Sequence, residues 1–390
     1  MYIGEYIDVK TAVLRSGCGE RTVPAGPWRR GILTLTRQWR KQGAEVMTGP
    51  SMKDVARVAG VSTKTVSNVV RGWPPVSPAT SKRVQAALDE LGYRMNLSAR
   101  MLRSGRSGII ALALPWLSSP YFAELTSAVV RIAECKGWTV LIDQTDGLAE
   151  REMLVIDGIR GQLIDGVIFS PSALGPEEMM RYHGRVPMVL LGERVGVGLN
   201  DHVAIDNVSA AFDVVSHLLQ IGRRRIAAIG LQVIAPAENA RLRAKGYELA
   251  LRSAHLPVNA RLQQPVAAFD RSEGAAALDR LLDQSSSDMP DAVFCFSDLL
   301  ALGAMHAAHR RGLRIPEDIA IAGFDDIEDG RYSNPPLTTV SPDKEALAAA
   351  AVEFLLTRLQ AGEEELSPRE FVPSYSLEVR ASTVGCSFKS

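Results

Sequence analysis

The sequence predicts a small all-α head with a helix-turn-helix pattern, followed by a larger α/β core of two lobes. Three short helical patterns follow one another between Lys53 and Gly92. From Gly108 onward, apolar strand patterns alternate with amphipathic helices, as in repeated βαβ units. This second region exceeds 270 residues, more than one core usually holds, so we expect two lobes of parallel sheet with helices on both faces.

The three helices of the head are expected from their end signals. Gly60 supplies a permissive turn residue after the first helix, and Ser62 can cap the second. Glycine and proline break the chain at 72–75, and Ser77 or Thr80 can open the third helix. The second helix would turn four polar side chains outward, those of Thr63, Lys64, Ser67 and Asn68. Such side chains can reach base edges in the major groove of DNA, although a helical hairpin with a polar outer face has the same pattern.

The strands of the core are continuous apolar runs, which is typical of strands covered on both faces. They are expected at Ile109–Leu114, Thr139–Asp143, Gly166–Phe169, Met188–Leu191, Ile226–Ile229, Ala292–Phe296 and Ile319–Gly323. Helical segments such as Phe122–Lys136 and Leu299–Arg311 lie between them. Ligands of such sheets bind at the carboxyl ends of the strands, so polar and aromatic residues there are the candidates for a binding site.

The charge is unevenly distributed along the 390 residues, whose formal net charge is zero. Ten basic and three acidic residues between Ser51 and Arg106 give this window +7, so the rest of the chain carries −7. A basic module on an acidic body is typical of a nucleic-acid binder. Residues 1–50 show no sustained period, and we interpret them as a disordered arm or a wrongly chosen upstream start codon. A basic arm that touches DNA is the alternative.

Composition and missing motifs exclude several classes of protein. The four cysteines are scattered without a CxxC pair, which favours neither a zinc site nor a disulfide framework. There is no apolar run of the ~20 residues that a membrane span needs, and no apolar segment of a secretory signal. The phosphate loop GxxxxGKS/T, the elbow GxSxG and the pair HExxH are missing. We expect a cytoplasmic protein that is not an enzyme and has no metal, cofactor or membrane partner.

Three segments together carry a resemblance to a known family. DVARVAGVSTKTVSNVV, then VSPATSKRV, then LGYRMNLSARMLRSGRSGIIALALP resemble the lactose-repressor (LacI/GalR) family in order and spacing. The resemblance covers residues 52–383. It implies a three-helix DNA-binding head, a hinge helix and a periplasmic-binding-protein-like core. It also implies a homodimer on palindromic double-stranded operator DNA, a small-molecule effector and the role of a repressor. No heptad repeat follows the core, so a tetramer-forming tail is not expected.

The resemblance also implies domain limits and DNA-contacting residues. The expected domains are the arm 1–50, the head 51–94, a hinge and linker 95–107, and an effector-binding core 108–384 with one lobe of about 108–206 and 342–367 and another of about 207–338 and 368–384. DNA contacts are expected from Thr63, Lys64, Ser67, Asn68, Asn96, Ala99 and Leu102. Asn68 stands where the family often has arginine, and Met95 where it has proline, which would loosen the turn into the hinge. Leu102 occupies the place of the leucine that enters the minor groove, the alternative being a leucine packed in its own domain.

Six residues match effector-binding positions of the family: Tyr121, Phe122, Arg243, Phe269, Ser297 and Asp325. The aromatic rings could also be core, and Arg243 could be a surface arginine. Arg243 and Asp325 are expected at two strand ends of the second lobe, where a guanidinium fork and a carboxylate suit a polyhydroxylated or mixed-charge ligand, a carbohydrate or related polyol. Asp298 is expected to cap the helix after Ser297, and Asp326 to be structural. The segment 377–383 resembles the last strand of the family.

A solute-binding protein of a transport system is the competing function, because it would use the same two-lobed core. It would not explain the basic head, and it would need an export signal. An enzyme on an α/β scaffold is a third hypothesis, weakened by the missing motifs. The six histidines show no metal-ligand spacing, and His306 and His309 are expected to be ordinary surface residues.

Overall fold

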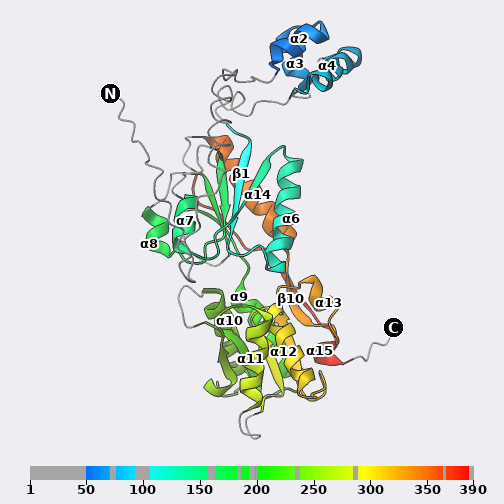
Figure 1. Ribbon diagram of the computed structural model, residues 1–390. Helices are drawn as coiled ribbons and strands as arrows, with labels where there is room; N and C mark the ends of the chain where they lie inside the picture. Colours follow the sequence, from blue (N-terminus) through cyan, green and yellow to red (C-terminus); the bar gives the residue numbers. More distant parts are fainter. Residues whose placement is uncertain are drawn as a thin grey trace, which may run out of the picture. The chain divides into compact units, whose positions relative to one another are not determined.

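The computed structural model of the chain forms two compact units, Met1–Asn96 and Leu97–Ser390 (Figure 1). It describes residues 50–70, 76–93, 106–156, 163–181, 186–192, 198, 200–232, 238–283, 289–362 and 366–385. The predicted arm before Pro50 and the hinge residues Asn96, Ala99 and Leu102 lie outside the described residues. Among the described helices, none is long and apolar enough to cross a membrane.

The head contains the three predicted helices, α2 (Met52–Ala59), α3 (Thr63–Val70) and α4 (Pro78–Leu91). Ser51 and Asp54 form a capping box at the start of α2, and Gly60 ends this helix at φ 61°. Ser77, rather than Thr80, caps α4 by accepting from the Thr80 N–H at 3.3 Å. A small apolar core holds the helices together, with Val55, Val66 and Val84 completely buried.

The first lobe of the second unit is built on a parallel six-stranded sheet in the order β11-β5-β4-β3-β1-β2. Its strands are β1 (Ile109–Leu114), β2 (Thr139–Gln144), β3 (Gly166–Phe169), β4 (Met188–Leu191), β5 (Asp201–Val203) and β11 (Glu370–Phe371). Alternate residues of these strands enter two separate cores. One core is covered by α6 (Pro120–Cys135) and α14 (Lys344–Ala361), and the other by α7 (Ala149–Ile156) and α8 (Pro176–Arg181) (Figure 1).

The second lobe has a six-stranded sheet in the order β12-β10-β9-β8-β6-β7, parallel except for β12. Its strands are β6 (Ile226–Leu231), β7 (Gln263–Pro265), β8 (Ala292–Cys295), β9 (Ala320–Phe324), β10 (Thr338–Pro342) and β12 (Tyr375–Glu378). Its longer helices are α9 (Asn207–Gln220), α10 (Glu238–Ser253), α11 (Arg271–Leu282) and α12 (Asp298–Arg310). Its short helices are η1 (Ala260–Leu262), α13 (Glu328–Arg331) and α15 (Ala381–Val384). Helices α11 and α12 pack so closely that a Cβ on Gly303 would lie 2.0 Å from the Arg271 carbonyl oxygen.

The predicted fold class, a helical head and a two-lobed α/β core, is confirmed, and the seven predicted strands are present with ends that differ by at most two residues. The boundary near residue 367 was placed too early, because β11 still pairs with β5 of the first lobe. Arg369 holds this segment there by binding the buried Asp201. The expected last strand 377–383 is also wrong in part. It ends at Glu378, and the Ser382 hydroxyl donates to the Ile321 carbonyl at 2.6 Å from the helical turn α15.

The two lobes are joined at three places in the described chain, after β5, after β10 and after β11. Strands β5 and β11 lie at one edge of the first sheet, and β10 and β12 lie at one edge of the second. All three connections therefore run along the same side of the two sheets. In the described residues, the opposite edges, formed by β2 and β7, carry no connection between the lobes.

Candidate functional site

The polar face of α3 is the candidate contact surface of the head. The Ser62 hydroxyl accepts from the Thr65 N–H at 3.1 Å, which starts the helix, and completely buried Val66 anchors it. Thr63 and Lys64 are exposed in the first turn, and the other two predicted readers, Ser67 and Asn68, are half-buried one turn later. Side chains at the start of a second helix are those that a helix-turn-helix protein brings to base edges.

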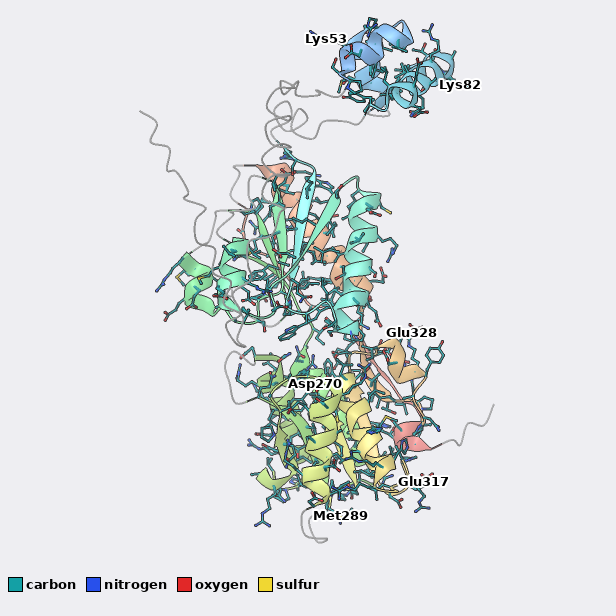
Figure 2. The ribbon with its side chains drawn as sticks, in the orientation of Figure 1. Lys53, Lys82, Asp270, Met289, Glu317 and Glu328 are labelled. Atoms are coloured by element: carbon teal, nitrogen blue, oxygen red, sulfur yellow. The ribbon has the colours of Figure 1, made fainter. Side chains whose placement is uncertain are left out.

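The other two helices of the head carry exposed basic residues. Four that are exposed lie on α2 and α4: Lys53, Arg57, Lys82 and Arg83. Figure 2 shows Lys53 and Lys82 extending from the surface of the head. Arg57 forms an ion pair with Asp54 at 3.5 Å, but both side chains are exposed, so the pair neutralises little of this charge. A surface with these exposed basic residues can neutralise the phosphates of DNA.

A cavity of about 610 Å³ opens between the lobes of the second unit, and we call it the interlobe cavity. All six predicted effector residues line it: Tyr121, Phe122, Arg243, Phe269, Ser297 and Asp325. Its volume is within the usual range for small-molecule sites, and its lining combines aromatic rings with a few convergent polar groups. Tyr121 and Asp325, which are 204 positions apart in the sequence, thus line the same cavity.

Arg243 is held firmly in the wall of the cavity. It lies on α10, not at a strand end as expected, because the chain after β6 enters the helix before it reaches this residue. Its Nε donates to Asn207 Oδ1 at 2.8 Å, its Nη1 donates to the Phe296 carbonyl, and its Cζ lies 3.6 Å from the centre of the Phe324 ring. Its Nη2 is 3.7 Å from Asp325 Oδ1, which is an ion pair without a hydrogen bond.

Asp325 follows β9 directly, in a turn with positive φ angles at Asp325 (115°) and Asp326 (45°). Asp326 fixes this turn because its carboxylate accepts from Arg331 at 2.7 Å and from Arg380 at 2.6 Å. Burial raises the pKa of Asp326, but the two guanidinium groups outweigh it and keep the pKa below its ordinary value. Asp326 therefore has a structural role, as expected, because it holds the turn that carries Asp325.

Ser297, and not Asp298, caps α12. The Ser297 hydroxyl caps the helix by accepting from the Leu300 N–H, and Asp298 is completely buried in the first turn. Asp298 accepts from the Thr339 hydroxyl at 2.6 Å and from the Ile327 N–H at 2.9 Å. Burial, together with the nearby Asp325 carboxylate, raises the pKa of Asp298 well above its ordinary value. Asp298 thus ties α12 to the turn that carries Asp325, and the expectation that it only caps the helix was wrong.

Aromatic rings from both lobes line the cavity. Tyr121 and Phe122 lie in the first turn of α6, with ring centres 5.4 Å apart in an edge-to-face arrangement. They are also partly buried against the core of the first lobe, as the alternative that they are core residues predicts. Phe269 follows β7 in the second lobe and packs partly against its core.

Sequence reasoning missed several residues that line the cavity, among them Trp116, Ser172, Gln232, Glu238 and Asn239. Trp116 and Ser172 follow β1 and β3, so their position at strand ends is the signal that could have found them. Glu152, on α7, was also missed. Its completely buried carboxylate accepts from the N–H groups of Ser172 at 2.7 Å and Leu174 at 2.9 Å, and from the Ala173 N–H between them. It holds the loop after β3, which lines the cavity.

Comparisons with known proteins agree with this geometry. The family model described as "Bacterial regulatory proteins, lacI family" matches residues 51–96, and that described as "Periplasmic binding protein-like domain" matches residues 215–383. The chain is 34% identical over 316 residues to the HTH-type transcriptional repressor CytR of Escherichia coli strain K12, covering 80% of this chain and 91% of CytR.

Two solved structures are similar over nearly their whole length. The transcriptional regulator CelR in complex with cellobiose has a TM-score of 0.63 at 29% identity, covering 85% of this chain and 99% of CelR. The lac repressor dimer bound to operator and the anti-inducer ONPF has a TM-score of 0.74 at 26% identity, covering 86% of this chain and 99% of that repressor.

Fold, cavity and relatives define a DNA-binding transcription regulator whose action is controlled by a ligand, not the solute-binding protein of a transport system. The competing function is therefore excluded by the helix-turn-helix head and by the nature of the relatives. The chain belongs to the lacI family of bacterial regulatory proteins.

Proposed function

We propose that the chain acts in the cytoplasm as a homodimeric repressor of a palindromic operator, and that a small carbohydrate in the interlobe cavity sets its affinity for DNA. The names of its relatives support this: CytR is a repressor, the lac repressor structure is a dimer on operator, and CelR holds cellobiose. The observation that carries the proposal is the interlobe cavity, in which Arg243 and Asp325 of one lobe share a space with Tyr121 and Phe122 of the other.

The pair of Arg243 and Asp325 would grip the ligand. Their closest atoms are 3.7 Å apart, too far for a hydrogen bond, and both side chains are nearly buried. Neighbouring hydroxyls of a sugar can accept from the guanidinium and donate to the carboxylate, which gives charge-assisted hydrogen bonds in a largely dehydrated site.

Control of DNA binding requires a difference in contacts. A ligand that touches Asp325 in one lobe and Tyr121 in the other stabilises the arrangement of the lobes in which both contacts form. That difference in binding free energy is the only source of free energy for switching the affinity for operator. Without that difference in binding free energy, even a tightly bound ligand would leave the affinity for operator unchanged.

DNA recognition would rest on the polar face of α3. Thr63, Lys64, Ser67 and Asn68 would contact base edges, and the exposed basic residues of the head would contact phosphates. Two heads on a dimer read two half-sites, so the preferred sequence should be palindromic. Asn96, Ala99 and Leu102 are proposed to contact the centre of the operator on the strength of the resemblance alone.

The test of DNA recognition is selection of tight-binding duplexes from a randomised pool, followed by anisotropy titrations of the selected duplex at two salt concentrations. We expect a palindrome, and a binding constant that falls steeply with salt because basic residues release counterions from phosphates. If the full-length protein prefers no sequence over the random pool, the function as a repressor is refuted.

The test of the cavity is a thermal-shift screen of sugars, polyols and nucleosides with the wild-type protein, because a ligand of the folded state raises the melting temperature. Arg243→Ala should abolish the shift given by any hit. Arg252→Ala is the matched control, since Arg252 lies on the same helix in an exposed ion pair with Glu248. A hit that stabilises the Arg243→Ala variant as strongly as wild type would place the ligand elsewhere.

A further inference from the structure

We propose that Trp116 and Ser172 form a second subsite at the mouth of the interlobe cavity, and that the effector carries two linked sugar rings, of which the outer one packs on Trp116. This inference rests on the proposed function, because it assumes that the cavity holds a carbohydrate. It goes beyond that function in stating the size of the ligand and the residue that reads its second ring.

The topology of the two sheets locates the mouth of the cavity. The three connections between the lobes run along the β5 and β11 side of the first sheet and the β10 and β12 side of the second. The open side is therefore that of the free edges, β2 and β7. Asp325 follows β9, the neighbour of β10, and so lies toward the connected side. Phe269 follows β7 and lies toward the open side.

Trp116 lies on the open side of the first lobe. It follows β1, whose neighbours are β2 at the free edge and β3. Gly147 follows β2, and Ser172 follows β3. A Cβ on Gly147 would lie 3.0 Å from Trp116 Cζ2 and 3.5 Å from Ser172 Oγ. The indole therefore lies at the ends of these three strands, beside Ser172. It lines the cavity and is still 46% exposed, whereas large apolar side chains without a partner are usually buried.

The surroundings of Trp116 hold this wall in place. The Leu117 N–H donates to Gln144 Oε1 at 3.2 Å, which ties the loop after β1 to the end of β2. Glu152 fixes the loop that carries Ser172 through N–H groups on three consecutive residues. Because both loops are anchored within the lobe, a ligand gains contact with the indole at little cost in ordering.

The chemistry of the wall suits a sugar ring better than an anionic group. An indole offers a broad, flat face with negative π-electron density, and the C–H groups on one face of a pyranose are apolar and slightly positive. Ser172, beside the indole, can hydrogen-bond to the hydroxyls at the rim of the same ring. Asp325, by contrast, follows β9 and lies toward the connected side, away from Trp116. A ligand that reaches both Asp325 and Trp116 must span the cavity from its connected side to its open side, which favours two linked rings over one.

The second lobe contributes groups at the same open side. Phe269 and Asp270 follow β7, and both line the cavity. Figure 2 shows Asp270 on the side of the second lobe that is turned toward the first. A ligand that extends from Asp325 to Trp116 thus passes residues of both lobes along its length. The cavity volume of about 610 Å³ is ample for two rings.

The test is isothermal titration of the full-length protein with single sugars and the disaccharides built from them: glucose with cellobiose and maltose, galactose with lactose, and xylose with xylobiose. The tightest compound should be a disaccharide. Trp116→Ala should weaken it at least tenfold and Trp116→Phe less than threefold, while binding of the corresponding monosaccharide changes less than twofold. Leu154→Ala is the control, since Leu154 is 45% exposed in the same lobe and does not line the cavity.

Each other outcome overturns the inference. If a monosaccharide binds as tightly as every disaccharide, or if Trp116→Ala binds the best disaccharide within twofold of wild type, the second subsite is rejected and the proposed function stands. If no sugar of either size binds, both the carbohydrate ligand and the subsite are rejected, while operator binding remains as a separate test of the regulator.

Discussion

Replacing Glu152 by glutamine should destabilise the core and weaken ligand binding together. The carboxylate accepts from three backbone N–H groups of one loop, with N···O distances of 2.7 to 3.1 Å. Glutamine keeps one acceptor oxygen but turns an NH₂ group toward the remaining donors. About two charge-assisted hydrogen bonds are lost, each worth roughly 1.5 kcal/mol or more, so we expect a loss of about 3 kcal/mol.

Calorimetric unfolding measures this loss. At roughly 2 °C per kcal/mol for a unit of this size, the melting temperature should fall by about 6 °C. Glu150→Gln is the matched control, because Glu150 lies exposed on the same helix. Affinity for any ligand of the interlobe cavity should fall with Glu152→Gln, since the loop that it holds carries Ser172. An unfolding temperature within about 1 °C of wild type would refute the reasoning.

Three further predictions concern other parts of the chain. Lys64→Ala should weaken operator binding and reduce its salt dependence without changing ligand affinity, as anisotropy and calorimetry would show. Gly147→Ala should lower the melting temperature by a few degrees and alter Trp116 fluorescence, because residue 147 has φ +63° and its Cβ would press on the indole; an unchanged emission spectrum would contradict this. Asp201 is buried against Arg358 and Arg369, which outweigh burial and lower its pKa below 3.8. The ionised Asp201 therefore contributes fully to the free energy of unfolding above pH 4, and this contribution is lost as the pH falls through the lowered pKa. Asp201→Asn should lower the free energy of unfolding by about 3 kcal/mol at pH 7 and make it depend less on pH in acid, as denaturant titrations over a range of pH would show.

The parts of the fold that the sequence predicted are those with a strong apolar period. The buried strands of β1, β3 and β4 were expected with their observed bounds, because covered parallel strands are apolar throughout. The short edge strands were not. Residues 263–265 of β7 are Gln-Gln-Pro, and β11 contains only Glu370 and Phe371, so neither has a period of its own. Their strand conformation is imposed by the neighbouring strand.

The candidate site was predicted unevenly for a similar reason. Arg243 and Asp325 were found because they occupy family positions in recognisable segments. Trp116 and Glu152 were not, since a tryptophan after a strand and a glutamate on an amphipathic helix also fit surface or core positions. Only the fold shows that Glu152 points to the backbone of a loop, and that Gly147 leaves room for the indole. The DNA-contacting and effector residues stay predictions until they are tested.

If the interlobe cavity controls the affinity for operator, thermodynamic linkage between ligand and operator provides a quantitative test of that control. The factor by which ligand changes operator affinity must equal the factor by which operator changes ligand affinity. Both factors can be measured by titration for wild type, for Asp325→Ala, and for Glu317→Gln as a control at the end of the second lobe opposite Asp270 (Figure 2). For wild type and the control, we expect the two factors to be equal and well above or below one. For Asp325→Ala, we expect both factors to be near one, while the affinity for operator without ligand stays that of wild type. A ligand that fills the cavity of the wild-type protein and leaves operator affinity unchanged would contradict the account.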